Sequence, residues 1–503
     1  MRRLLFIFLT VIVSFGYAQS DTLQDKRLTA DQQKEDFRLY RKLLEETHPG
    51  LYRYTSKEVI QSRMNEVEES LNSEQSFYDF FRTLAQLNAE IRCAHTYVIP
   101  SKNLNSFIRK IKTVPFFFFP INGKPYVLFN GTLNETIKPG FELVSINGIK
   151  VDSLRSKLHK HKWSDGYIEL AKDITLTGSS FWLFYYSFID QSESYEMVFK
   201  DFDNQLISIE SPAQSTALTS SNYKKNPVNK KMLKMYNNGP SKPFKLSFLK
   251  DIPDVAALSF NSFGEGDSEN EAQQAMRNFM DKSLKKIKKK GSKYLIVDLR
   301  NNGGGWDVHG VELLSYLMKD DEPFEYYKYA YTITDNSEFL KYADVPASER
   351  EKIKDELTQQ PNGTYLLSAE QNIGIGPFES KERKFEGKIY FLINEQTSSA
   401  ASEFASLAKS YELGVFIGKE TNGAYEGGNS FSFIKMSLPN SGIFVNTPLV
   451  AGFTNVKPQE HSGRGLLPDY DIGFTREDLM IRNDRQLNFI KKLIRKDIKS
   501  STE

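Results

Sequence analysis

Hydrophobic residues recur at helical spacing in the first part of the chain. Ile60, Met64, Val67 and Leu71 lie three or four positions apart, which places their side chains on one face of a helix. The stretches "DFRLYRKLLEETHPG" and "SEQSFYDFFRTLAQLNAEI" repeat this spacing, so we expect three amphipathic helices. The last of them runs into "RCAHTYVIP", whose β-branched and aromatic residues favour a strand. His95 is therefore expected at a helix-to-strand junction.

After about residue 113 the pattern changes to short apolar runs, such as "YVLF" and "YEMVFK", separated by turn residues. Runs of this kind predict a β-rich domain with short strands. The next stretch, "SSNYKKNPVNKKMLKMYNNGPSKP", is rich in Asn and Lys. We interpret it as a linker.

From about residue 245 onward, strand and helix patterns alternate, which predicts an α/β domain. "KYLIVDL" and "KIYFLI" are continuous apolar strands; the loop "RNNGGG" follows the first, the turn "NEQT" follows the second, and a helix pattern follows each of these. Residues 320–385 interrupt the alternation with a polar insertion. It is either a lid or decoration of the domain, and decoration is the simpler interpretation.

Composition narrows the classes of partner. The chain has 503 residues, with 66 Lys and Arg against 64 Asp and Glu, a formal charge of +2. This balance gives no overall field that would attract nucleic acid or anionic lipid, and we expect no nucleic-acid partner. The length suggests two to four domains. Cys93 is the single cysteine, so no internal disulfide can form.

The first residues indicate export. A basic start is followed by an apolar run from Leu4 to about Phe15 and a small-residue exit at Ala18, which is the pattern of a signal peptide. The run is shorter than a typical membrane-spanning helix. We therefore expect cleavage after Ala18, a periplasmic or extracellular location, and no integral membrane segment in the mature protein.

Three serines stand at the start of a predicted helix, directly after an apolar strand: Ser398, Ser399 and Ser402. Open α/β sheets place their sites at this edge, and the free N–H groups of a helix start can stabilise an oxyanion. Serine is also a favoured N-cap, so position alone does not identify a nucleophile. The glycines of "RNNGGG" add a second set of backbone donors that can approach closely.

Four segments, "LIVDLRNNGGG", "TSSAASEFASLAK", "VFIGKETNG" and "GRGLLPD", occur in this order. Together they resemble the S41 serine peptidases, which include carboxyl-terminal processing proteases and tricorn core proteases. The resemblance covers about residues 245–475, and "HPGLYRY" and "CAHTYV" extend it toward the N-terminus. "IKPGFELVSINGIKVDSL" is similar to the core strand and turn of a PDZ domain. The family implies a ClpP/crotonase-like α/β catalytic domain, a peptide or protein substrate, no cofactor and no metal.

The resemblance also implies roles for individual residues. Thr397-Ser398-Ser399-Ala400 fits the family's nucleophile motif and selects Ser399. Many members of the family carry a helix Glu one residue closer to the nucleophile than Glu403 is to Ser399. An alignment fixed on this Glu would instead put Ala400 in the nucleophile's place and imply an inactive enzyme. The amides of Ala400 and of Gly303 or Gly304 are the expected oxyanion hole.

A serine nucleophile needs a base. The lysine used in one branch of the family is replaced by Ala424, and Lys419 stands early in its loop. In the tricorn-like branch the base is a histidine oriented by an acid, and His95 and Glu460 match these two positions. His461 is the main rival base. His309 is a candidate lining residue, and His159 and His161 are weak candidates for metal ligands on a strand.

The sequence thus predicts an exported serine endopeptidase or carboxyl-terminal processing peptidase. The alternatives are an inactive peptide-binding or scaffolding protein of the same fold, and an esterase. The oligomeric state is left open. The expected domains are a signal peptide (1–18), a helical N-terminal region (19–112), a PDZ-like domain (113–215), a linker (216–244), an α/β catalytic domain (245–485) and a C-terminal helix (486–503).

Overall fold

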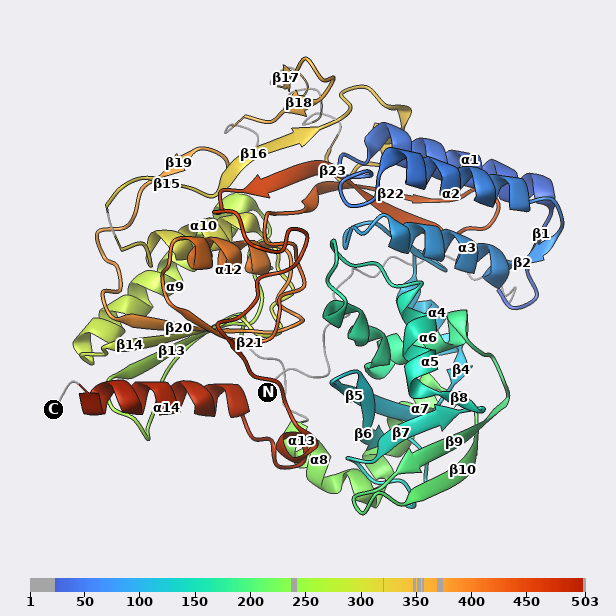
Figure 1. Ribbon diagram of the computed structural model, residues 1–503, viewed down its shortest axis with the longest axis horizontal. Helices are drawn as coiled ribbons and strands as arrows, with labels where there is room; N and C mark the ends of the chain where they lie inside the picture. Colours follow the sequence, from blue (N-terminus) through green and yellow to red (C-terminus); the bar gives the residue numbers. More distant parts are fainter. Residues whose placement is uncertain are drawn as a thin grey trace.

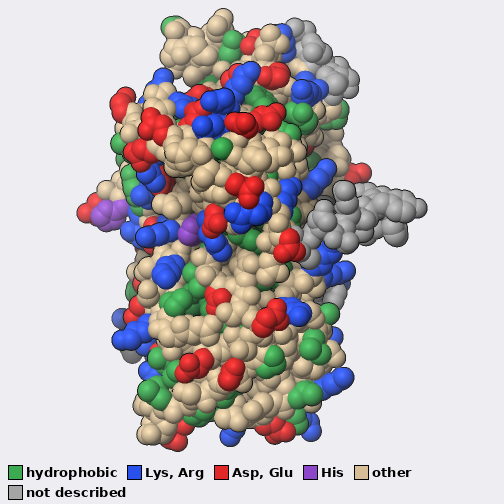
Figure 2. Space-filling view, turned by 90° about the vertical axis from the view of Figure 1, so that its right-hand side faces the viewer, with side chains coloured by type: hydrophobic (Ala, Val, Ile, Leu, Met, Phe, Trp, Pro, Cys, Tyr) green, Lys and Arg blue, Asp and Glu red, His purple; other side chains and the backbone are tan. Residues whose placement is uncertain are grey.

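The computed structural model describes residues 23–500 except 237–241, 320, 347–349, 351–353, 355–356 and 369–373. The predicted signal peptide lies outside the described residues. Among those described, none of the helices combines the length and the apolar composition needed to cross a bilayer. Acidic and basic side chains are interspersed over the face shown in Figure 2, in keeping with the small net charge.

A mainly parallel sheet forms the centre of the predicted catalytic domain, with the strand order β12-β13-β14-β20-β21-β24. β12 pairs antiparallel with β13 and the other pairs are parallel, as the alternation of strands and helices predicts. The strands are β12 (Phe244–Phe248), β13 (Val255–Phe260), β14 (Tyr294–Asp298), β20 (Lys388–Ile393), β21 (Val415–Gly418) and β24 (Tyr470–Asp471).

Helices cover both faces of this sheet (Figure 1). The helices α9 (Glu269–Lys289), α10 (Asp307–Ser315) and α12 (Ala400–Ser410) share one apolar core with the sheet. The C-terminal helix α14 (Arg485–Ser500) packs Ile490 and Ile494 against the opposite face. This layered α/β arrangement confirms the predicted fold class.

The helical N-terminal region is also confirmed. It contains α1 (Ala30–Thr47), α2 (Lys57–Ser70) and α3 (Phe77–Glu90), each started by a Ser or Thr cap, as expected from the preference for hydroxyl side chains at helix starts. Strand β3 (Tyr97–Ile99) follows α3, so His95 does lie between a helix and a strand. Short pairs β1 (Arg27–Leu28) and β2 (Gln75–Ser76), and helix α4 (Leu104–Lys110), complete the region.

A second sheet, antiparallel, links the N-terminal region to the α/β domain. Its order is β17-β18-β16-β23-β22, and β3 also pairs with β23. The strands are β16 (Tyr327–Thr332), β17 (Thr358–Gln359), β18 (Tyr365–Leu366), β22 (Asn429–Ser437) and β23 (Phe444–Thr454). β16 comes from the predicted insertion 320–385 and lies inside this sheet, next to β23 (Figure 1). This part of the insertion is therefore built into the domain; short segments β15 (Phe324–Glu325), η3 (Glu338–Tyr342) and β19 (Pro377–Phe378) accompany it.

The predicted β-rich region forms a third sheet, with the order β10-β9-β7-β6-β5 and β8 paired to β7. The strands are β5 (Phe116–Ile121), β6 (Lys124–Asn130), β7 (Glu142–Ile146), β8 (Ile149–Lys150), β9 (Ser194–Lys200) and β10 (Leu206–Pro212). The likeness to a PDZ domain stays a prediction.

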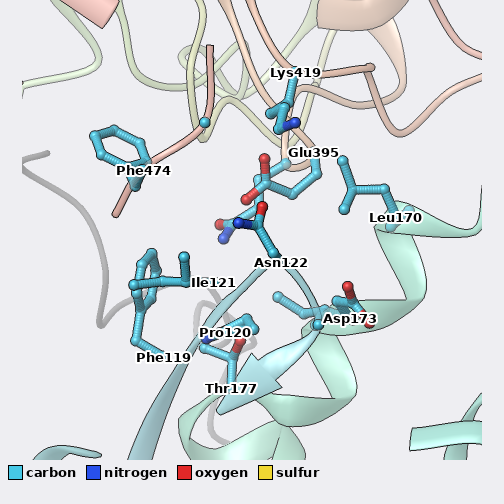
Figure 3. Close-up of a pocket in the computed structure, with 15 residues that line it drawn as sticks. Phe119, Pro120, Ile121, Asn122, Leu170, Asp173, Thr177, Glu395, Lys419 and Phe474 are labelled. Carbon is cyan, nitrogen blue, oxygen red and sulfur yellow. The ribbon is translucent and has the colours of Figure 1, made fainter. Parts of the chain in front are cut away.

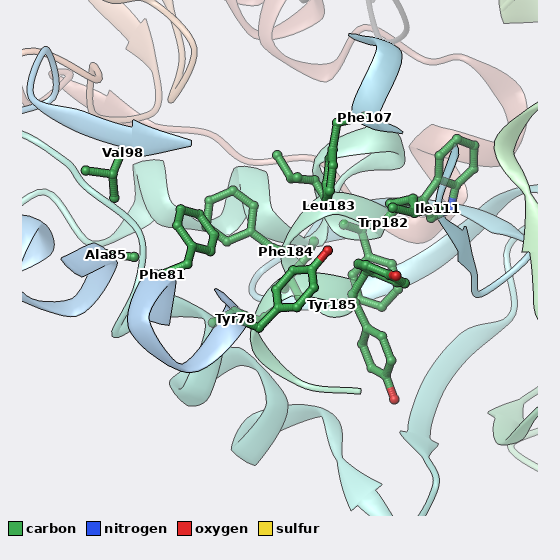
Figure 4. Packing of buried hydrophobic residues seen from close by; sticks show 14 of the residues in the cluster. Tyr78, Phe81, Ala85, Val98, Phe107, Ile111, Trp182, Leu183, Phe184 and Tyr185 are labelled. Carbon is green, nitrogen blue, oxygen red and sulfur yellow. The ribbon is translucent and has the colours of Figure 1, made fainter. Parts of the chain in front are cut away.

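The β-rich region also contains helices that the sequence did not predict, namely α5 (Val151–His159), η1 (Leu170–Leu176) and α6 (Gly178–Phe188). Residues 181–187 of α6 are all buried, so the helix shows no polar face in the sequence. Trp182, Leu183, Phe184 and Tyr185 pack beside residues from the N-terminal region, including Tyr78 and Phe81 (Figure 4). This shared core joins the third sheet to α3.

The linker prediction is also wrong over residues 216–236. This stretch forms α7 (Thr216–Lys225), η2 (Pro227–Asn229) and α8 (Lys230–Tyr236), and a short β11 (Gln214–Ser215) pairs with β4 (Lys112–Thr113). Two of its asparagines, which suggested a loop, are buried and bonded to backbone. Asn229 Nδ2 donates to Asn130 O at 2.7 Å, and Asn226 Nδ2 donates to Thr132 O at 2.8 Å. A last short helix, α13 (Arg476–Ile481), and β24 lead into α14.

Candidate active site

Ser399 occupies a sharp turn between β20 and α12. Its backbone has φ 52° and ψ −138°, and its side chain makes no capping hydrogen bond to the helix. A positive φ at a non-glycine residue is strained and is found mostly at functional sites. An N-cap serine has an extended backbone and bonds to the helix start. Ser399 therefore does not act as an ordinary cap, and its half-buried hydroxyl is available for chemistry.

Side-chain bonds hold this turn against the loop after β14. Thr397 Oγ1 donates to Leu299 O at 3.0 Å, and Asn394 Nδ2 donates to Asn301 Oδ1 at 3.0 Å. Asn394 Oδ1 accepts from the amide of Asn301 at 2.9 Å. Because β14 and β20 are parallel neighbours, their carboxyl ends place both turns at one edge of the sheet. Hydrogen bonds thus join the turn of the candidate nucleophile to the glycine loop.

Gly304 comes closest to the serine. A Cβ at this position, where φ is +93°, would lie 2.6 Å from Ser399 Cβ and 2.9 Å from Ser398 O. No side chain fits in that space, which is the close approach that the run of glycines predicted. The amide of Ser398 also donates to Asn302 O at 3.0 Å.

The predicted oxyanion donors differ in their engagement. The amide of Gly304 donates to Asn302 Oδ1 at 3.0 Å. For the amides of Gly303 and Ala400, no acceptor is found within the described part of the chain, and Gly303 is exposed. Free backbone donors beside a serine are the components of an oxyanion hole. Of the two glycines, Gly303 therefore has the available donor.

His95 lies in the turn between α3 and β3, where its segment meets the second sheet. Asn446 Nδ2 donates to His95 O at 2.7 Å, and the imidazole stacks on Phe433 with a centroid distance of 5.8 Å. The Nδ1 atom is buried and has no hydrogen-bond partner among the described residues. Burial lowers the pKa of His95, while the charge of Asp165 acts in the opposite direction. The ring is therefore neutral at neutral pH and able to accept a proton.

Asp165 was not singled out by the sequence. Its side chain is buried, and its Oδ1 accepts from the amide of Ala94 at 2.7 Å, next to His95. A second hydrogen bond joins the same two segments, from the amide of Gly166 to Arg92 O at 2.9 Å. No motif marks an aspartate in "WSDGY", so the sequence gives no signal that would have found it.

Glu460, the predicted orienting acid, lies in an exposed bend. No contact between Glu460 and His95 is found in the described structure, and none between Ser399 and His95. His461 is exposed beside Glu460. Lys419 forms an ion pair with Asp471 at 2.6 Å. The structure thus brings Ser399, Ala400 and the glycines together, and leaves His95 and Glu460 without a direct bond to them.

One loop runs from the serine to the histidine region. The amide of Asn422 donates to Thr397 O at 2.7 Å, and a Cβ on Gly423 would be 3.5 Å from Ser399 N. Further along, a Cβ on Gly428 would lie 3.8 Å from Asp165 Oδ2. The charge of Asp165 also reaches Glu403 on the first turn of α12. Ser399 and Asp165 therefore border opposite ends of the short segment 422–428, and Asp165 bonds to the residue before His95.

Two acids, buried Glu403 and half-buried Asp307, lie under the serine helix. Tyr327 Oη donates to Glu403 Oε2 at 2.6 Å. Burial, together with the neighbouring charge of Asp307, raises the pKa of Glu403; burial also raises the pKa of Asp307. The two carboxyls therefore hold protons at a pH where free carboxyls are charged. Since Tyr326 Oη donates to Ala400 O at 3.3 Å, this cluster supports the start of α12.

The remaining histidines have structural surroundings. His309 is buried behind the glycine loop, where its Nε2 bonds to Glu265 O at 2.9 Å, so it does not line the site. His48 Nε2 bonds to Thr96 Oγ1 at 2.6 Å and steadies the segment of His95. His159 and His161 stand at the end of α5 and beyond it, not on a strand. No cluster of potential metal ligands is found among the described residues.

Comparisons with known proteins bear on the family and the fold. Residues 254–472 match the model of peptidase family S41. No curated protein sequence matches the chain. Among solved structures, the chain resembles mature CPAF in complex with lactacystin, with a TM-score of 0.61, 16% identity and coverage of 94% of this chain and 99% of that one.

Two further structures are similar. A serine-to-alanine mutant of CPAF gives a TM-score of 0.62 at 16% identity, covering 93% of this chain and 98% of that one. The photosystem II D1 C-terminal processing protease gives a TM-score of 0.39 at 13% identity, covering 88% and 93%. At these identities the likeness to CPAF shows a shared fold.

Proposed function

Because residues 254–472 form a domain of peptidase family S41, we propose that this protein is an exported serine peptidase that hydrolyses peptide bonds. The observation that carries the proposal is the strained turn at Ser399, whose hydroxyl makes no capping bond, with the free amide of Ala400 next to it in the chain and the glycine loop packed against it. A cap serine needs neither the strain nor the glycines packed against it. A nucleophile needs both an exposed hydroxyl and donors for the oxyanion.

In the proposed mechanism, Ser399 Oγ attacks the carbonyl carbon of the scissile peptide bond while the imidazole of His95 takes the hydroxyl proton. The negative charge that forms on the carbonyl oxygen is bound by the amides of Ala400 and Gly303. The intermediate collapses, the C–N bond breaks, and His95 gives its proton to the leaving amine. Water then attacks the acyl-enzyme with the same base, which releases the carboxylate product and restores Ser399.

The imidazole must carry a positive charge during each step, and a nearby carboxylate stabilises it. Glu460 is the acid implied by the family resemblance and stays a prediction. Asp165 is the carboxylate whose charge acts on His95 in the described structure. Both belong to the proposal, and variants of each separate their roles.

The proposal includes a closing movement, since His95 and Ser399 come from distant segments and no hydrogen bond joins them in the described structure. Catalytic hydrogen bonds often tighten only when substrate binds. Segment 422–428 runs between Ser399 and Asp165, and Asp165 bonds to the amide next to His95, so a small shift of this segment or of Asp165 changes the separation of Ser399 and His95.

Substrate class and location complete the proposal. The family implies peptide or protein substrates, and we include endopeptidase and carboxyl-terminal processing specificity, with the third sheet as a PDZ-like module that presents the substrate. The sequence pattern of residues 1–18 supports export to the periplasm or the extracellular space.

A fluorophosphonate probe tests the nucleophile directly. It should label the intact chain on Ser399, and Ser399→Ala should abolish labelling. Ser398→Ala and Ser402→Ala are matched controls, since they remove neighbouring hydroxyls, and both should retain the label. Peptide mapping that finds the label on another serine overturns the assignment.

The second candidate is a peptide-binding protein of the same fold without catalysis. It is favoured by the exposed position of Glu460 and by the missing bond between Ser399 and His95. A folded chain that takes no label and cleaves no peptide, yet binds peptides, would support it. An esterase is distinguished by turnover of simple esters without any peptide cleavage.

A further inference from the structure

A pocket lies between the third sheet and the α/β domain, on the flank of the serine turn (Figure 3). The β5–β6 turn and η1 form one side. Glu395, Gln396 and Lys419, at the carboxyl ends of β20 and β21, form the other. The space between these two sides is open to solvent. No step of the proposed peptidase mechanism uses these residues.

Most of the lining is apolar. Phe119, Pro120, Ile121, Leu170, Ala171, Ile174 and Phe474 contribute to it. Such a wall suits the aliphatic part of a side chain and excludes strongly hydrated groups. A ligand for this space must therefore combine an apolar stem with a polar group that matches the few polar side chains of the lining.

The charged groups leave one carboxylate unmatched. Asp173 is paired with the guanidinium of Arg155 and bonded to His159 Nε2 at 3.1 Å. Lys419 is paired with Asp471 at 2.6 Å. Glu395 has no ion-pair partner among the described residues, and its carboxylate points toward Asn122 in the pocket (Figure 3).

The surroundings of Glu395 disfavour the charged form of its carboxyl group. Burial raises the pKa of Glu395, the more distant charge of Lys419 partly offsets this, and the charge of Asp173 adds to it. A desolvated carboxylate is stabilised by a cation that enters the same space. An anionic ligand would meet Glu395 and Asp173 and is disfavoured.

The pocket is connected to the nucleophile through the chain. Glu395 stands four positions before Ser399, inside the turn that Asn394 and Thr397 tie to the glycine loop. A ligand bound to Glu395 thus contacts the same hydrogen-bonded turn that carries the hydroxyl of Ser399. The proposed nucleophile and this pocket lie on one rigid turn.

We propose that this pocket binds a basic side chain of a peptide, with the aliphatic stem of a lysine or arginine against Phe119, Ile121 and Leu170 and its cationic head on Glu395. The site is distinct from the bond-breaking site and holds peptide by charge and apolar contact. Lysine and arginine suit it because each carries a charged head on an apolar stem.

Isothermal titration of the full chain tests the site with two small probes, Nα-acetyl-lysine methylamide and Nα-acetyl-norleucine methylamide. The two differ in the ammonium group and share the stem. The lysine probe should bind at least about tenfold more tightly, since only its ammonium group can form a charge-assisted hydrogen bond with Glu395. Equal affinities for the two probes overturn the proposal.

Variants locate the binding. Glu395→Gln keeps the size of the side chain and should weaken the lysine probe about tenfold or more while leaving the norleucine probe unchanged. Ile174→Phe narrows the pocket from its apolar side and should weaken both. Glu135→Gln, at an exposed loop position, is the matched control and should bind like the unaltered chain. Full affinity for the lysine probe in Glu395→Gln places the binding elsewhere and refutes the assignment.

Two sources of the basic side chain are distinguished by kinetics. If it belongs to the substrate, Glu395→Gln raises KM for a peptide that carries lysine and not for its norleucine counterpart. If it belongs to a separate peptide, the lysine probe changes turnover of a substrate without basic residues. The titration requires no turnover, so its failure leaves the proposed peptidase intact, and loss of peptidase activity leaves the pocket intact.

Discussion

The serine side and the histidine side of the candidate site are built in different ways. Ser399 lies in a turn that side-chain bonds from Asn394 and Thr397 fix to the neighbouring loop, and a glycine packs directly against it. His95 lies on a segment from the N-terminal region, and its Nδ1 has no partner in the part of the chain that is described. The serine turn is held by several hydrogen bonds, whereas the His95 ring has a buried nitrogen without a hydrogen-bond partner among the described residues.

This difference indicates which parts of the mechanism are ready before substrate arrives. The proposed oxyanion donors and the proposed nucleophile follow adjacent parallel strands, so the sheet itself fixes their geometry. The base and its acid belong to segments that meet only through tertiary contacts. We therefore expect variants on the serine side to act through chemistry and anchoring, and variants on the histidine side to act through proton affinity and docking.

The largest expected effect comes from removing either reacting group. Ser399→Ala and His95→Ala should each lower kcat/KM for a cleaved peptide by about 10⁴-fold or more, because the hydroxyl and its base act as a unit. Circular dichroism should show both variants folded. A loss under tenfold for either residue would exclude it from the catalytic set.

The next effect concerns how the glycine loop is anchored. Arg300, buried at the start of this loop, bonds to Asp298 at 2.7 Å and to Asp484, just before α14, at 2.8 Å. Arg300→Met leaves two carboxylates without their partner and should destabilise the α/β domain by about 3–5 kcal/mol. Thermal unfolding measures this.

Arg495→Met is the matched control for that variant, since Arg495 forms an exposed ion pair with Asp251 at 3.1 Å. Its cost should stay below about 1 kcal/mol. Equal unfolding temperatures for Arg300→Met and Arg495→Met would show that α14 does not anchor the loop.

A smaller effect decides between the two candidate acids. Asp165→Asn keeps the acceptor for the Ala94 amide and removes the charge, and it should lower kcat/KM by roughly 10–100-fold, the value of one charged hydrogen bond. The charge of Asp165 raises the pKa of His95, so its removal lowers that pKa. The acid limb of the pH–rate profile is expected below the ordinary histidine pKa of about 6.5. In Asp165→Asn it should move to still lower pH.

Glu460→Gln is the comparison variant. If Glu460 stays exposed during turnover, the variant leaves the acid limb in place and the rate nearly unchanged. A shift of the limb in Glu460→Gln, together with a normal profile in Asp165→Asn, would assign the orienting role to Glu460 and show that its loop moves to His95 during catalysis.

The smallest effect tests the support under Ser399. The pKa values of Glu403 and Asp307 are raised in the folded chain, so the folded state holds protons that the unfolded state releases near pH 4. Stability should therefore be complete below that pH and fall as pH rises through the raised pKa values. Glu403→Gln, which keeps an acceptor for Tyr327, should reduce this slope by up to about 1.4 kcal/mol per pH unit. Thermal melts from pH 5 to 9 measure it, and identical slopes would contradict the prediction.

The sequence predicted the α/β domain and the N-terminal helices because their apolar spacing matches the elements directly, as in Ile60 and Met64 of α2. It failed at α6, since a helix buried on nearly every side has no polar face to reveal its period. It failed at residues 216–236 because Asn226 and Asn229, usual in loops, here bond to buried backbone. Local propensity gave way to tertiary contacts in both places.

By itself, the sequence determined the S41 family assignment, the order of strand, glycine loop, strand and serine helix, and the choice of Ser399 among neighbouring serines as a prediction. These depend on residues close together in the chain. Tertiary structure alone decided that Asp165 lies beside His95, that Gly304 has its amide engaged while Gly303 does not, and that Glu460 is exposed. Asp165 bonds to the amide of Ala94, at a sequence separation of 71 positions. The free energy that selects such a contact comes from packing of the whole chain, which no local pattern encodes.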